Sequence, residues 1–284
     1  MSIIPVCEEL QLSELPQLCI EFTYSDIQIA TNYFNELLLI GEGGYGKVYK
    51  GNITVGESRD KLVVAIKHLK LSSHQGEREF LAEIGIQSKL RHRNLVSLIG
   101  YCKHEEQERF IVLEYISKGS LEDRLHRREY PPLTLVRRLQ ILIGAACGLD
   151  HLHTGTGINH GVIHRDMKTA NILLDDNWVA KICDFGLSKT GPTNQTSNYV
   201  RGTPGYVDPD YCETLVPTQK TDVYMFGVIM LEVLCVRKAV DVSFDDPNQH
   251  VLTKWAQECF RINSLAQIVD TNLVQAAGAI SARC

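Results

Sequence analysis

Two short stretches, HRDMKTAN (residues 164–171) and DFG (residues 184–186), decide how the rest of this sequence is interpreted. The first stretch places an aspartate, a lysine and an asparagine close together, and the second adds another aspartate. Carboxylate and amide oxygens are ligands that Mg²⁺ prefers, and a lysine neutralises phosphate charge. The set can therefore hold a divalent metal, a polyphosphate and an attacking hydroxyl together. The same residue types also crowd ordinary turns, so the motif needs support from the rest of the chain.

The overall composition is that of an ordinary soluble globular protein. The chain has 284 residues, a formal net charge of −5 and nine cysteines. This length suits one large domain or two lobes with a sizeable core. The acidic balance argues against a nucleic-acid-binding protein. The cysteines are scattered singly without a C-x-x-C pair, which argues against a disulfide framework and a zinc site and favours a reducing compartment.

Targeting signals are not evident in the sequence. No uninterrupted apolar run is long enough to span a bilayer. The first residues, MSIIP, form neither a secretory signal nor a myristoylation site, which requires glycine at the second position. We therefore expect a cytoplasmic chain with no membrane segment, in which any association with the plasma membrane is made through a partner or a longer parent protein.

The beginning of the chain is expected to be peripheral. Residues 1–21 are acidic with two prolines and predict a flexible or loosely docked extension. An apolar pattern then predicts a short helix on the outside of the first lobe, with Ser25 or Asp26 as its N-cap. Further along, Ser120 follows a turn and is the predicted N-cap of another helix.

The stretch GEGGYGKV (residues 41–48) is a glycine-rich turn. Its G-x-G-x-x-G spacing also occurs in dinucleotide-binding units, where a helix follows the turn. Here residues 48–51 and 61–67 are rich in β-branched side chains and predict strands instead. This pattern fits a flap over nucleotide phosphates, because glycines let backbone N–H groups approach closely. For the loop alone, an ordinary glycine-rich hairpin is the alternative.

Lys67 ends the apolar strand VVAIK (residues 63–67). Burying a lysine is costly unless an opposite charge pairs with it. The partner is expected on the next helix, predicted over residues 76–90, where Glu77, Glu79 and Glu83 are candidates. For Glu83 the alternative is a surface helix acid.

The remaining pattern predicts a mixed architecture. Residues 95–100 and 109–113 predict two more strands, which complete a five-stranded antiparallel sheet. Leucines and other apolar residues at three- and four-residue steps predict a long buried helix over residues 133–153. A short hairpin is expected over residues 172–182. Cys183 follows it, and its thiol either faces a nucleotide or is a small buried hydrophobe.

Three longer stretches carry a resemblance to a known family. They are HRDMKTANILLDDNWVAKICDFGLSKTGP (residues 164–192), GTPGYVDPDY (residues 202–211) and DVYMFGVIMLEVLC (residues 222–235). With the other motifs, they make the sequence resemble plant receptor-like serine/threonine protein kinases over about residues 22–272. It is most similar to the malectin-like receptor kinases and the related receptor-like cytoplasmic kinases.

The resemblance implies a bilobal α+β protein-kinase fold. The N-lobe, with the preceding helix, would cover residues 22–114 and contain the five-stranded antiparallel sheet and one helix. The mostly helical C-lobe would cover residues 115–284 and lack its last helices, because the family's domain continues for about two more helices by analogy. The resemblance also selects Glu83 as the partner of Lys67.

The resemblance further implies a protein serine/threonine kinase that uses ATP and Mg²⁺, with Mn²⁺ as a substitute. Asp166 would orient the attacking hydroxyl or accept its proton, and Lys168 would neutralise charge on the transferred phosphoryl group. Asn171 and Asp184 would hold the metal ion, and Lys67 would bind phosphate. The other expected ATP-binding residues are Gly41, Glu42, Gly43, Gly44, Tyr45, Gly46, Val48, Ala65, Leu113, Glu114, Ile116 and Leu173.

Regulation is expected in the polar segment over residues 187–202, which the resemblance identifies as an activation segment. Arg165 directly precedes Asp166, which favours control by a phosphate that pairs with Arg165 and orders the segment. The expected phosphorylation sites are Thr196 and Ser197, with Thr203 as a weaker candidate. Lys168 together with Thr203 is the combination typical of serine/threonine kinases.

Two further positions are expected to support the catalytic elements. Asp222 would accept backbone N–H bonds from the 164–171 stretch. Phe185 would stack with the residue one turn after Glu83, which is usually aliphatic in kinases. In this chain that residue is Gln87, and Gly85 lies in the same helix at a cost of about 1 kcal/mol relative to alanine. Both features would make the active helix position less stable.

Another departure concerns Asp210, which replaces the glutamate expected after Pro209 and is one methylene shorter. Together with Gln87 and the missing helices, it favours an alternative: a catalytically weak or inactive pseudokinase scaffold or decoy that binds nucleotide and partner kinases. The intact Lys67, Asp166 and metal-binding residues favour the enzyme. The expected partners are protein substrates, with other kinases and a transient homodimer for autophosphorylation in trans as further candidates, and no nucleic acid.

Overall fold

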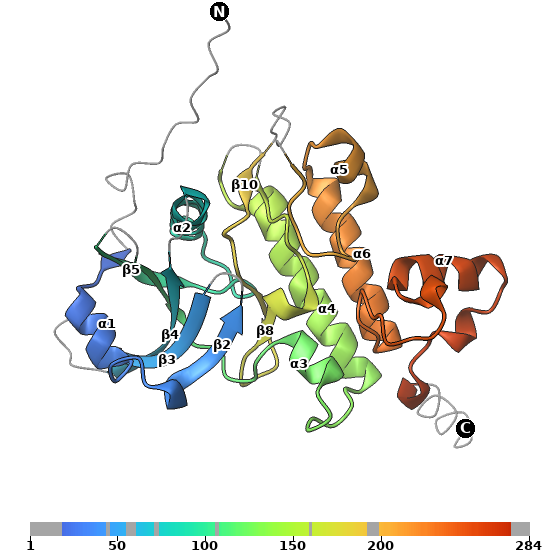
Figure 1. The fold of residues 1–284 in the computed structure, drawn as a ribbon, viewed down its shortest axis with the longest axis horizontal. Coiled ribbons are helices and arrows are strands. Elements are labelled where there is room, and N and C mark those ends of the chain that lie inside the picture. Colours follow the sequence, from blue (N-terminus) through green and yellow to red (C-terminus); the bar gives the residue numbers. More distant parts are fainter. Residues whose placement is uncertain are drawn as a thin grey trace, which may run out of the picture. The chain divides into compact units, whose positions relative to one another are not determined.

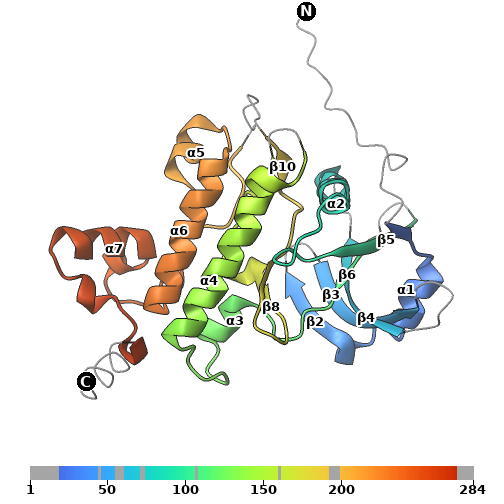
Figure 2. The same cartoon turned by 180° about the vertical axis from the view of Figure 1, so that it is seen from behind.

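The structure, a computed structural model, describes residues 19–43, 46–54, 61–70, 74–105, 108–158, 161–191 and 199–273. The chain divides into two compact units. The first unit consists of Met1–Arg91 and Val96–Tyr115, and the second of His92–Leu95 and Ile116–Cys284. Figures 1 and 2 show the helices and strands of both units from opposite sides.

The first unit is built on a six-stranded sheet with the strand order β1-β5-β6-β4-β3-β2. Neighbouring strands are antiparallel, except that β1 and β5 are parallel. The predicted antiparallel sheet is therefore confirmed, with one strand more than expected. The strands are β1 (Ile20–Glu21), β2 (Leu39–Gly43), β3 (Gly46–Thr54), β4 (Lys61–Lys70), β5 (Leu98–His104) and β6 (Glu108–Glu114).

The additional strand comes from the end of the segment that was expected to be a flexible extension. Ile20 pairs with Gly100 of β5, and the Phe22 N–H donates to the Tyr101 carbonyl oxygen over 2.8 Å. A Cβ atom at Gly100 would collide with the Ile20 carbonyl oxygen, so the glycine lets the two strands approach. Residues 20 and 21 therefore belong to the sheet, and residues 1–18 lie outside the described residues.

Helix α1 (Tyr24–Ala30) begins slightly earlier than predicted, because Thr23 is its N-cap. The Thr23 hydroxyl accepts a hydrogen bond from the Asp26 N–H over 3.2 Å, and the Asp26 carboxylate accepts one from the Thr23 N–H over 2.9 Å. This capping box satisfies two N–H groups at once. The predicted caps Ser25 and Asp26 are thus both inside the helix, and Asp26 acts as the reciprocal partner of Thr23.

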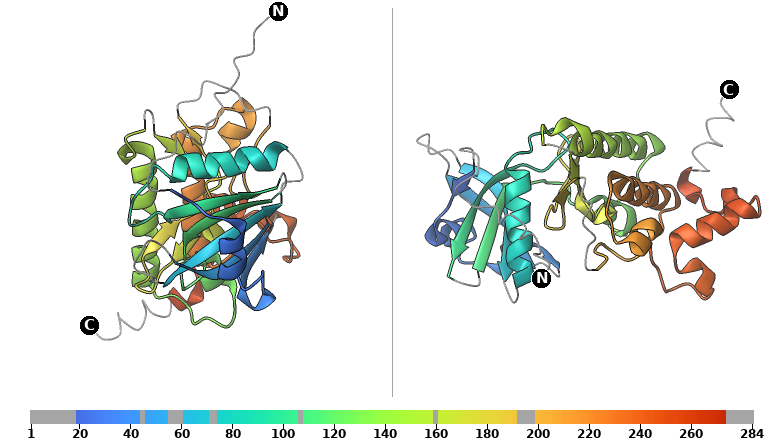
Figure 3. Two further views of the ribbon diagram at one scale, coloured as in Figure 1. Left: turned by 90° about the vertical axis from the view of Figure 1, so that its left-hand side faces the viewer. Right: turned by 90° about the horizontal axis from the view of Figure 1, so that it is seen from above.

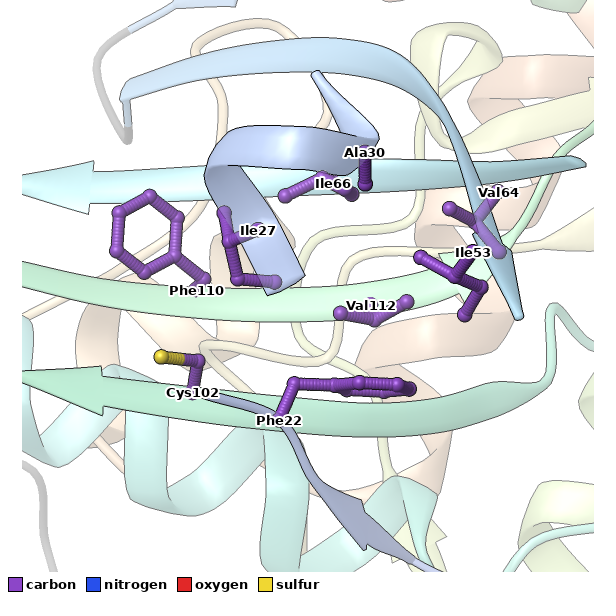
Figure 4. Packing of buried hydrophobic residues seen from close by; sticks show 9 residues of the cluster. All are labelled: Phe22, Ile27, Ala30, Ile53, Val64, Ile66, Cys102, Phe110 and Val112. Carbon is purple, nitrogen blue, oxygen red and sulfur yellow. The ribbon is translucent and has the colours of Figure 1, made fainter. Parts of the chain in front are cut away.

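Figure 4 shows the core that α1 forms with one face of the sheet. Phe22, Ile27 and Ala30 pack there, and Ile27 has no exposed surface. Burial of an aliphatic side chain of this size contributes roughly 1.5–3 kcal/mol, so residues 22–30 stabilise the first unit. The strand residues of this core are Ile53, Val64, Ile66, Cys102, Phe110 and Val112.

Helix α2 (His74–Gln87) lies on the opposite face of the sheet from α1, as Figure 3 shows. The sequence predicts this helix over residues 76–90. The observed helix ends earlier because a turn follows it, in which the Leu90 N–H donates to the Gln87 carbonyl oxygen over 3.1 Å. The side chains that α2 directs toward the sheet include Glu83, which matters for the site described below.

The strand predicted over residues 95–100 begins only at Leu98. The residues before it belong to the second unit, where Leu95 forms an isolated bridge with Ile182. The Ile182 N–H donates to the Asn94 carbonyl oxygen over 2.9 Å, and the Asn94 side-chain amide donates to the Ala180 carbonyl oxygen over 2.8 Å. Residues 94 and 95 are extended, but their backbone partners come from a different sheet.

The second unit is mostly helical, with two small two-stranded sheets. The sheets are the hairpin β8 (Ile172–Leu174) with β9 (Ala180–Ile182), and β7 (Val162–Ile163) with β10 (Lys189–Thr190). The helices are α3 (Leu121–His126), α4 (Leu135–Asp150), α5 (Pro209–Thr214), α6 (Gln219–Cys235) and α7 (Leu252–Arg261). Shorter helical turns are η2 (Glu36–Leu38) in the first unit and η3 (His151–Gly155), η4 (Thr169–Asn171), η5 (Pro247–Gln249) and η6 (Leu265–Gln267) in the second.

Two predicted helices of the second unit are confirmed with adjusted ends. Ser120 caps α3 as expected, since its hydroxyl accepts a hydrogen bond from the Asp123 N–H over 3.1 Å. The long helix predicted over residues 133–153 is α4, which ends at Asp150 and continues as the π-helical turn η3. Figures 1 and 2 show α4 beside α6, the two longest helices of this unit.

A buried arginine joins α4 to the end of α6. Arg138 is 2% exposed, and its guanidinium donates to the Val233 carbonyl oxygen over 2.7 Å and to the Asp270 carboxylate. Burial alone raises the pKa of Asp270, but the hydrogen bonds from Arg138 and Asn272 outweigh it, so the pKa is lowered. The ionised pair therefore fixes the segment after α7 against the main helices.

Candidate active site

The stretch His164–Asn171, called the catalytic loop below, connects β7 to β8 in the second unit. Asp222 of α6 holds the start of this loop. Its fully buried carboxylate accepts the N–H groups of His164 and Arg165, each over 2.8 Å. These bonds confirm the predicted role of Asp222. They also hold Arg165 at φ 71°, a left-handed conformation that costs about 1–2 kcal/mol in a non-glycine residue.

Three polar side chains, those of Thr203, Lys168 and Asn171, converge at the Asp166 carboxylate, which is 3% exposed. The Thr203 hydroxyl donates to Oδ1 over 2.7 Å, and Lys168 Nζ lies 2.9 Å from Oδ2. Lys168 Nζ also donates to the Thr203 hydroxyl over 2.9 Å, and Asn171 Nδ2 is 3.3 Å from Oδ2. A carboxylate thus accepts a hydrogen bond from a hydroxyl beside an ammonium group, and this arrangement can orient a hydroxyl and neutralise phosphate charge.

The DFG stretch follows β9 directly. The ring of Phe185 is fully buried and meets the ring of His164 edge to face, with centroids 5.1 Å apart. The Cys183 N–H donates to the Asn171 carbonyl oxygen over 3.0 Å, which brings the residue before Asp184 to the catalytic loop. Asp184 has φ 68°, another left-handed conformation outside glycine. Cys183 itself is partly buried.

The chemistry of Asn171 and Asp184 fits a magnesium ion. Asn171 Nδ2 donates to the Asp166 carbonyl oxygen over 2.8 Å, which leaves the amide oxygen as the atom suited to a cation. Mg²⁺ is typically bound by one or two protein oxygens together with water and substrate phosphate oxygens. Within the described parts of the chain, no group of three or more histidine, cysteine or acidic residues could hold a metal.

The first unit carries a buried ion pair between Lys67 of β4 and Glu83 of α2. Lys67 Nζ lies 2.8 Å from Glu83 Oε2, and the two residues are 9% and 1% exposed. The predicted pairing is therefore confirmed. The pair holds the lysine ammonium in a fixed position on the face of the sheet opposite α1.

The remaining predicted nucleotide contacts are distributed over both units. Gly46 has φ 124°, and a Cβ atom there would collide with the His68 carbonyl oxygen, so this turn of the β2–β3 hairpin requires glycine. Ala65 and Leu113 are paired neighbours in β4 and β6. The β2–β3 hairpin also contains Gly41, Glu42, Gly43 and Val48, and β6 ends at Glu114. The second unit contains Ile116 and Leu173. Two predicted contacts, Gly44 and Tyr45, lie outside the described residues.

Comparison with known proteins identifies the family of the chain. A sequence profile of the protein tyrosine and serine/threonine kinase family matches residues 35–269. The chain belongs to this family. This match confirms the kinase fold, and the relatives described next confirm the resemblance to receptor-like kinases.

Several relatives are receptor-like protein kinases of Arabidopsis thaliana. FERONIA is 46% identical over 276 residues, which cover 96% of this chain and 30% of that kinase. ANXUR2 is 47% identical over 270 residues, which cover 94% of this chain and 30% of the relative. THESEUS 1 is 48% identical over 256 residues, or 89% of this chain and 29% of the relative. The chain thus spans about 30% of the length of these kinases. Among the described residues, no helix is long and apolar enough to cross a membrane.

Gln87, the departure from the kinase pattern, is fully buried at the end of α2. Its Nε2 donates to the Val96 carbonyl oxygen over 2.8 Å, while its Oε1 has no hydrogen-bond partner among the described residues. The side chain therefore ties α2 to the segment before β5 through a hydrogen bond, where the pattern has apolar packing. One bond of this kind contributes about 1 kcal/mol, which offsets part of the expected weakness of this helix.

Arg165 and one of the predicted phosphorylation sites, Thr203, lie among the described residues. The Arg165 guanidinium is buried and donates to the Tyr211 hydroxyl over 2.6 Å and to the Leu187 carbonyl oxygen over 3.1 Å. Thr203 contacts Asp166 as described above, so a phosphate there would add negative charge beside that carboxylate. Thr196 and Ser197 lie outside the described residues. Asp210 is exposed in α5, where its N–H donates to the Asp208 carboxylate.

Sequence reasoning missed a buried network below the segment that contains Thr203. The Tyr206 hydroxyl donates to the Glu232 carboxylate and lies 3.2 Å from the Thr169 hydroxyl. His126 Nε2 contacts the other oxygen of Glu232 at 2.7 Å. Burial and the adjacent Glu232 carboxylate strongly raise the pKa of Tyr206, so its hydroxyl stays protonated. The one available signal was an acidic residue inside the apolar α6.

Proposed function

We propose that the chain is a protein kinase that transfers the γ-phosphate of ATP to serine and threonine hydroxyls of protein substrates. The observation that carries the proposal is the cluster around Asp166. There a carboxylate already accepts a hydrogen bond from an aliphatic hydroxyl, that of Thr203, at 2.7 Å. A substrate hydroxyl has the same donor chemistry as Thr203, so this contact supports the role of Asp166 in orienting the hydroxyl and accepting its proton.

Lys168 is assigned to charge neutralisation. Its ammonium is held 2.9 Å from both the Asp166 carboxylate and the Thr203 hydroxyl, so it would lie beside a hydroxyl that attacks phosphorus. Positioned cations near developing charge are the main means by which proteins assist phosphoryl transfer. The combination of Lys168 and Thr203 also supports serine and threonine as acceptors, by resemblance to serine/threonine kinases.

The phosphates of ATP are assigned to Lys67, whose position Glu83 fixes over 2.8 Å. Asn171, through its amide oxygen, and Asp184 are assigned to Mg²⁺, with Mn²⁺ as a substitute. When bound, the metal ion would neutralise the charge of the phosphate oxygens. The relatives are named as receptor-like protein kinases, which supports a role in signalling with protein substrates, other kinases or a second copy of this chain as partners.

The test is phosphoryl transfer from radiolabelled Mg-ATP to the chain itself and to a generic basic protein. The wild-type chain should incorporate phosphate on serine and threonine. Asp166→Asn should reduce transfer by about 10²–10⁴-fold, the usual contribution of a general base, and should bind ATP with nearly unchanged affinity. Circular dichroism and thermal unfolding of both proteins would show that each is folded.

Two results would contradict this function. Equal transfer by wild type and Asp166→Asn would remove the assigned role of Asp166. Nucleotide binding without any transfer by a folded wild-type chain would instead support the alternative of a nucleotide-binding scaffold for partner kinases.

A further inference from the structure

A half-buried indole in the second unit, that of Trp178, is surrounded by three cations. The Lys118 ammonium lies 5.6 Å from the centroid of the Trp178 ring, and the guanidinium carbons of Arg124 and Arg137 lie 5.4 Å and 5.1 Å from it. The Arg124 guanidinium also lies over the Tyr130 ring, 3.8 Å from its centroid. These distances are within the range of about 6 Å in which a ring face attracts a cation. Lys118, Arg124, Arg137 and Trp178 are called the cationic cluster below.

Backbone contacts fix two parts of this cluster. Trp178 lies in the β8–β9 turn with φ 64°, a left-handed conformation that is rare for a bulky residue. The Asp175 carboxylate holds this turn, because it accepts the N–H groups of Asn177 and Val179, each over 2.8 Å. The Lys118 N–H donates to a carbonyl oxygen of β8 over 2.9 Å, and α3 lies beside the same strand (Figure 2). The backbone that carries Trp178 and Lys118 is therefore in place before any ligand binds.

Two of the three cations lack an anionic partner. Among the residues that the structure describes, the Arg137 guanidinium takes part in no hydrogen bond or ion pair. The Arg124 guanidinium donates only to the Lys118 carbonyl oxygen, over 2.8 Å, within the same described residues. The Lys118 ammonium lies 3.7 Å from the exposed Asp176 carboxylate. Positive charges gathered around one ring repel one another, so a bound anion would stabilise the cluster.

Arg137 also occupies a position that is unfavourable for a cation. It is the third residue of α4, and the first turn of this helix contains no acidic residue. The N-terminal end of a helix carries partial positive charge, which stabilises anions and disfavours cations. An anion bound by Arg137 would therefore be stabilised by the helix end as well as by the guanidinium.

We propose that the cationic cluster is a docking site for a phosphorylated serine or threonine in a segment of a partner protein. A phosphate monoester carries a charge of about −1.5 to −2 near pH 7 and has three strong acceptor oxygens. It matches two guanidinium groups without a carboxylate partner and a neighbouring ammonium, and arginine binds phosphate through two parallel hydrogen bonds. A carboxylate carries less charge and has only two oxygens, so it would satisfy fewer of these donors.

The size of the cluster favours a peptide phosphate over larger polyanions. Anionic membrane surfaces are typically bound by about four to eight lysines and arginines, and nucleic acids by extended basic surfaces of basic domains. The cluster contains three cations, and the chain has a formal net charge of −5. The docking needs neither ATP nor the residues assigned to phosphoryl transfer, so it does not depend on the proposed function.

The test is calorimetric titration of the dephosphorylated full chain, without nucleotide, with a short glycine- and alanine-based peptide that has one central phosphoserine. The same peptide with serine or glutamate at that position, and vesicles of phosphatidylcholine with phosphatidylserine, are the comparison ligands. We expect the phosphopeptide to bind at least about tenfold more tightly than the other two peptides, because hydrogen bonds to a doubly charged group are stronger. The vesicles should not bind.

Two conditions test the nature of the interaction in the wild type. Binding of the phosphopeptide should weaken as the salt concentration rises, because the cluster is partly exposed to solvent and its charges are screened. Binding should also weaken from about pH 7.5 to about pH 5, because the phosphate loses its second negative charge below its pKa of about 6.

Variants assign the binding to the cluster. Arg137→Gln should weaken phosphopeptide binding by about tenfold, and Arg137→Lys by less, because the charge remains while the paired hydrogen bonds are lost. The matched control Arg128→Gln removes an exposed arginine of the same unit and should leave binding unchanged. Tryptophan fluorescence should change on binding in the wild type but not in Trp178→Phe, in which only Trp255 remains. Circular dichroism would show that each variant is folded.

The proposal is overturned if no peptide binds, or if the serine or glutamate peptide binds as tightly as the phosphopeptide. Binding of the vesicles without binding of the phosphopeptide, or an equal loss of affinity in Arg128→Gln and Arg137→Gln, would also contradict it. If a variant does not fold, phosphopeptide binding by the wild type that is unchanged at high salt and at about pH 5 would overturn it. None of these outcomes concerns phosphoryl transfer, so the proposed function would stand.

Discussion

Two of the buried ion pairs among the described residues, one in each unit, use the same physics for different purposes. Lys67 and Glu83 join a strand to a helix in the first unit, and Arg138 and Asp270 join α4 to the segment after α7 in the second. Arg138 also donates to the end of α6, so its pair belongs to the packing of the unit. Lys67 is held by Glu83 at a position where the family resemblance places a phosphate-binding lysine.

The difference lies in what remains when one partner is removed. An arginine cannot lose its proton in a protein, so an unpaired Arg138 would keep its full charge in a buried position. A buried glutamate can take up a proton and become neutral, so loss of Lys67 leaves a group that can adapt. The Arg138–Asp270 pair is therefore expected to control stability, and the Lys67–Glu83 pair to control chemistry. The following predictions test this contrast.

The largest effect is expected for Asp270→Asn. The substitution leaves Arg138 charged and buried without its partner, which costs about 3–5 kcal/mol. Thermal and urea unfolding should show this loss in the second unit, and Asp245→Asn, an exposed aspartate of the same unit, is the matched control. A loss below about 1 kcal/mol would mean that the pair contributes no more than a surface salt bridge.

Lys67→Met should reduce phosphoryl transfer by about 10²–10³-fold, or about 2.7–4 kcal/mol, the usual cost of removing one positioned electrostatic group. Its loss of unfolding stability should be clearly smaller than that of Asp270→Asn, because Glu83 can become protonated. Lys61→Met, at an exposed position of the same strand, should change neither property. Comparable stability losses in Lys67→Met and Asp270→Asn would abolish the distinction between the pairs.

Acid should weaken the second pair selectively. The pKa of Asp270 is lowered from its ordinary value of 3.8 by hydrogen bonds that outweigh its burial. A carboxylate with a lowered pKa in the folded state contributes stability that is present above its unfolded pKa and is lost as the pH falls through its folded pKa. Unfolding measured from about pH 6 to pH 2.5 should therefore show a loss below about pH 4 in the wild type that is smaller in Asp270→Asn. Parallel curves would show that other carboxylates dominate.

The smallest effect is expected for Gln87→Met, which keeps the side-chain volume near the Lys67–Glu83 helix. The change removes the bond to the Val96 carbonyl oxygen but also removes an amide oxygen that has no partner among the described residues. The two terms nearly cancel, so stability should change by less than about 1 kcal/mol. A loss of about 2 kcal/mol or more in chemical unfolding would show that the Gln87 bond is an essential anchor of α2.

The residues to which we assign the catalytic roles could be proposed from the sequence because they are local. Lys168, Asn171 and Asp184 lie in short motifs whose spacing survives in the linear sequence, and a strand–turn–strand pattern marked the glycine-rich hairpin. The Lys67–Glu83 pair was also predictable, since a lysine in an apolar strand requires an acid nearby, although β4 runs on to Lys70 and Lys67 does not end it as expected. Assigning that acid to Glu83 needed the family resemblance, because Glu77 and Glu79 lie on the same helix.

Other features depend on contacts between distant parts of the chain. The two residues of β1 form a strand because Gly100, 80 positions away, admits their backbone. Thr23 and Asp26 have the three-residue spacing of a capping box in the sequence. However, Thr23, Ser25 and Asp26 all have side chains that can cap a helix, so the sequence did not identify Thr23 as the cap. Likewise, nothing near Glu232 indicates that Tyr206 and His126 will satisfy its buried carboxylate.

By itself, the sequence determined the family, the catalytic loop and the residues that the proposed chemistry needs, because motifs and hydrophobic periodicity are written in consecutive positions. Only the tertiary structure decided which buried charges meet. Arg138 forms an ion pair with Asp270, and the Arg165 guanidinium donates a hydrogen bond to the Tyr211 hydroxyl. The same hydroxyl accepts a hydrogen bond from the Arg201 N–H. The physical reason is that a buried polar group must be satisfied by whichever partner the packing of helices brings within about 3 Å, and sequence separation does not limit that choice.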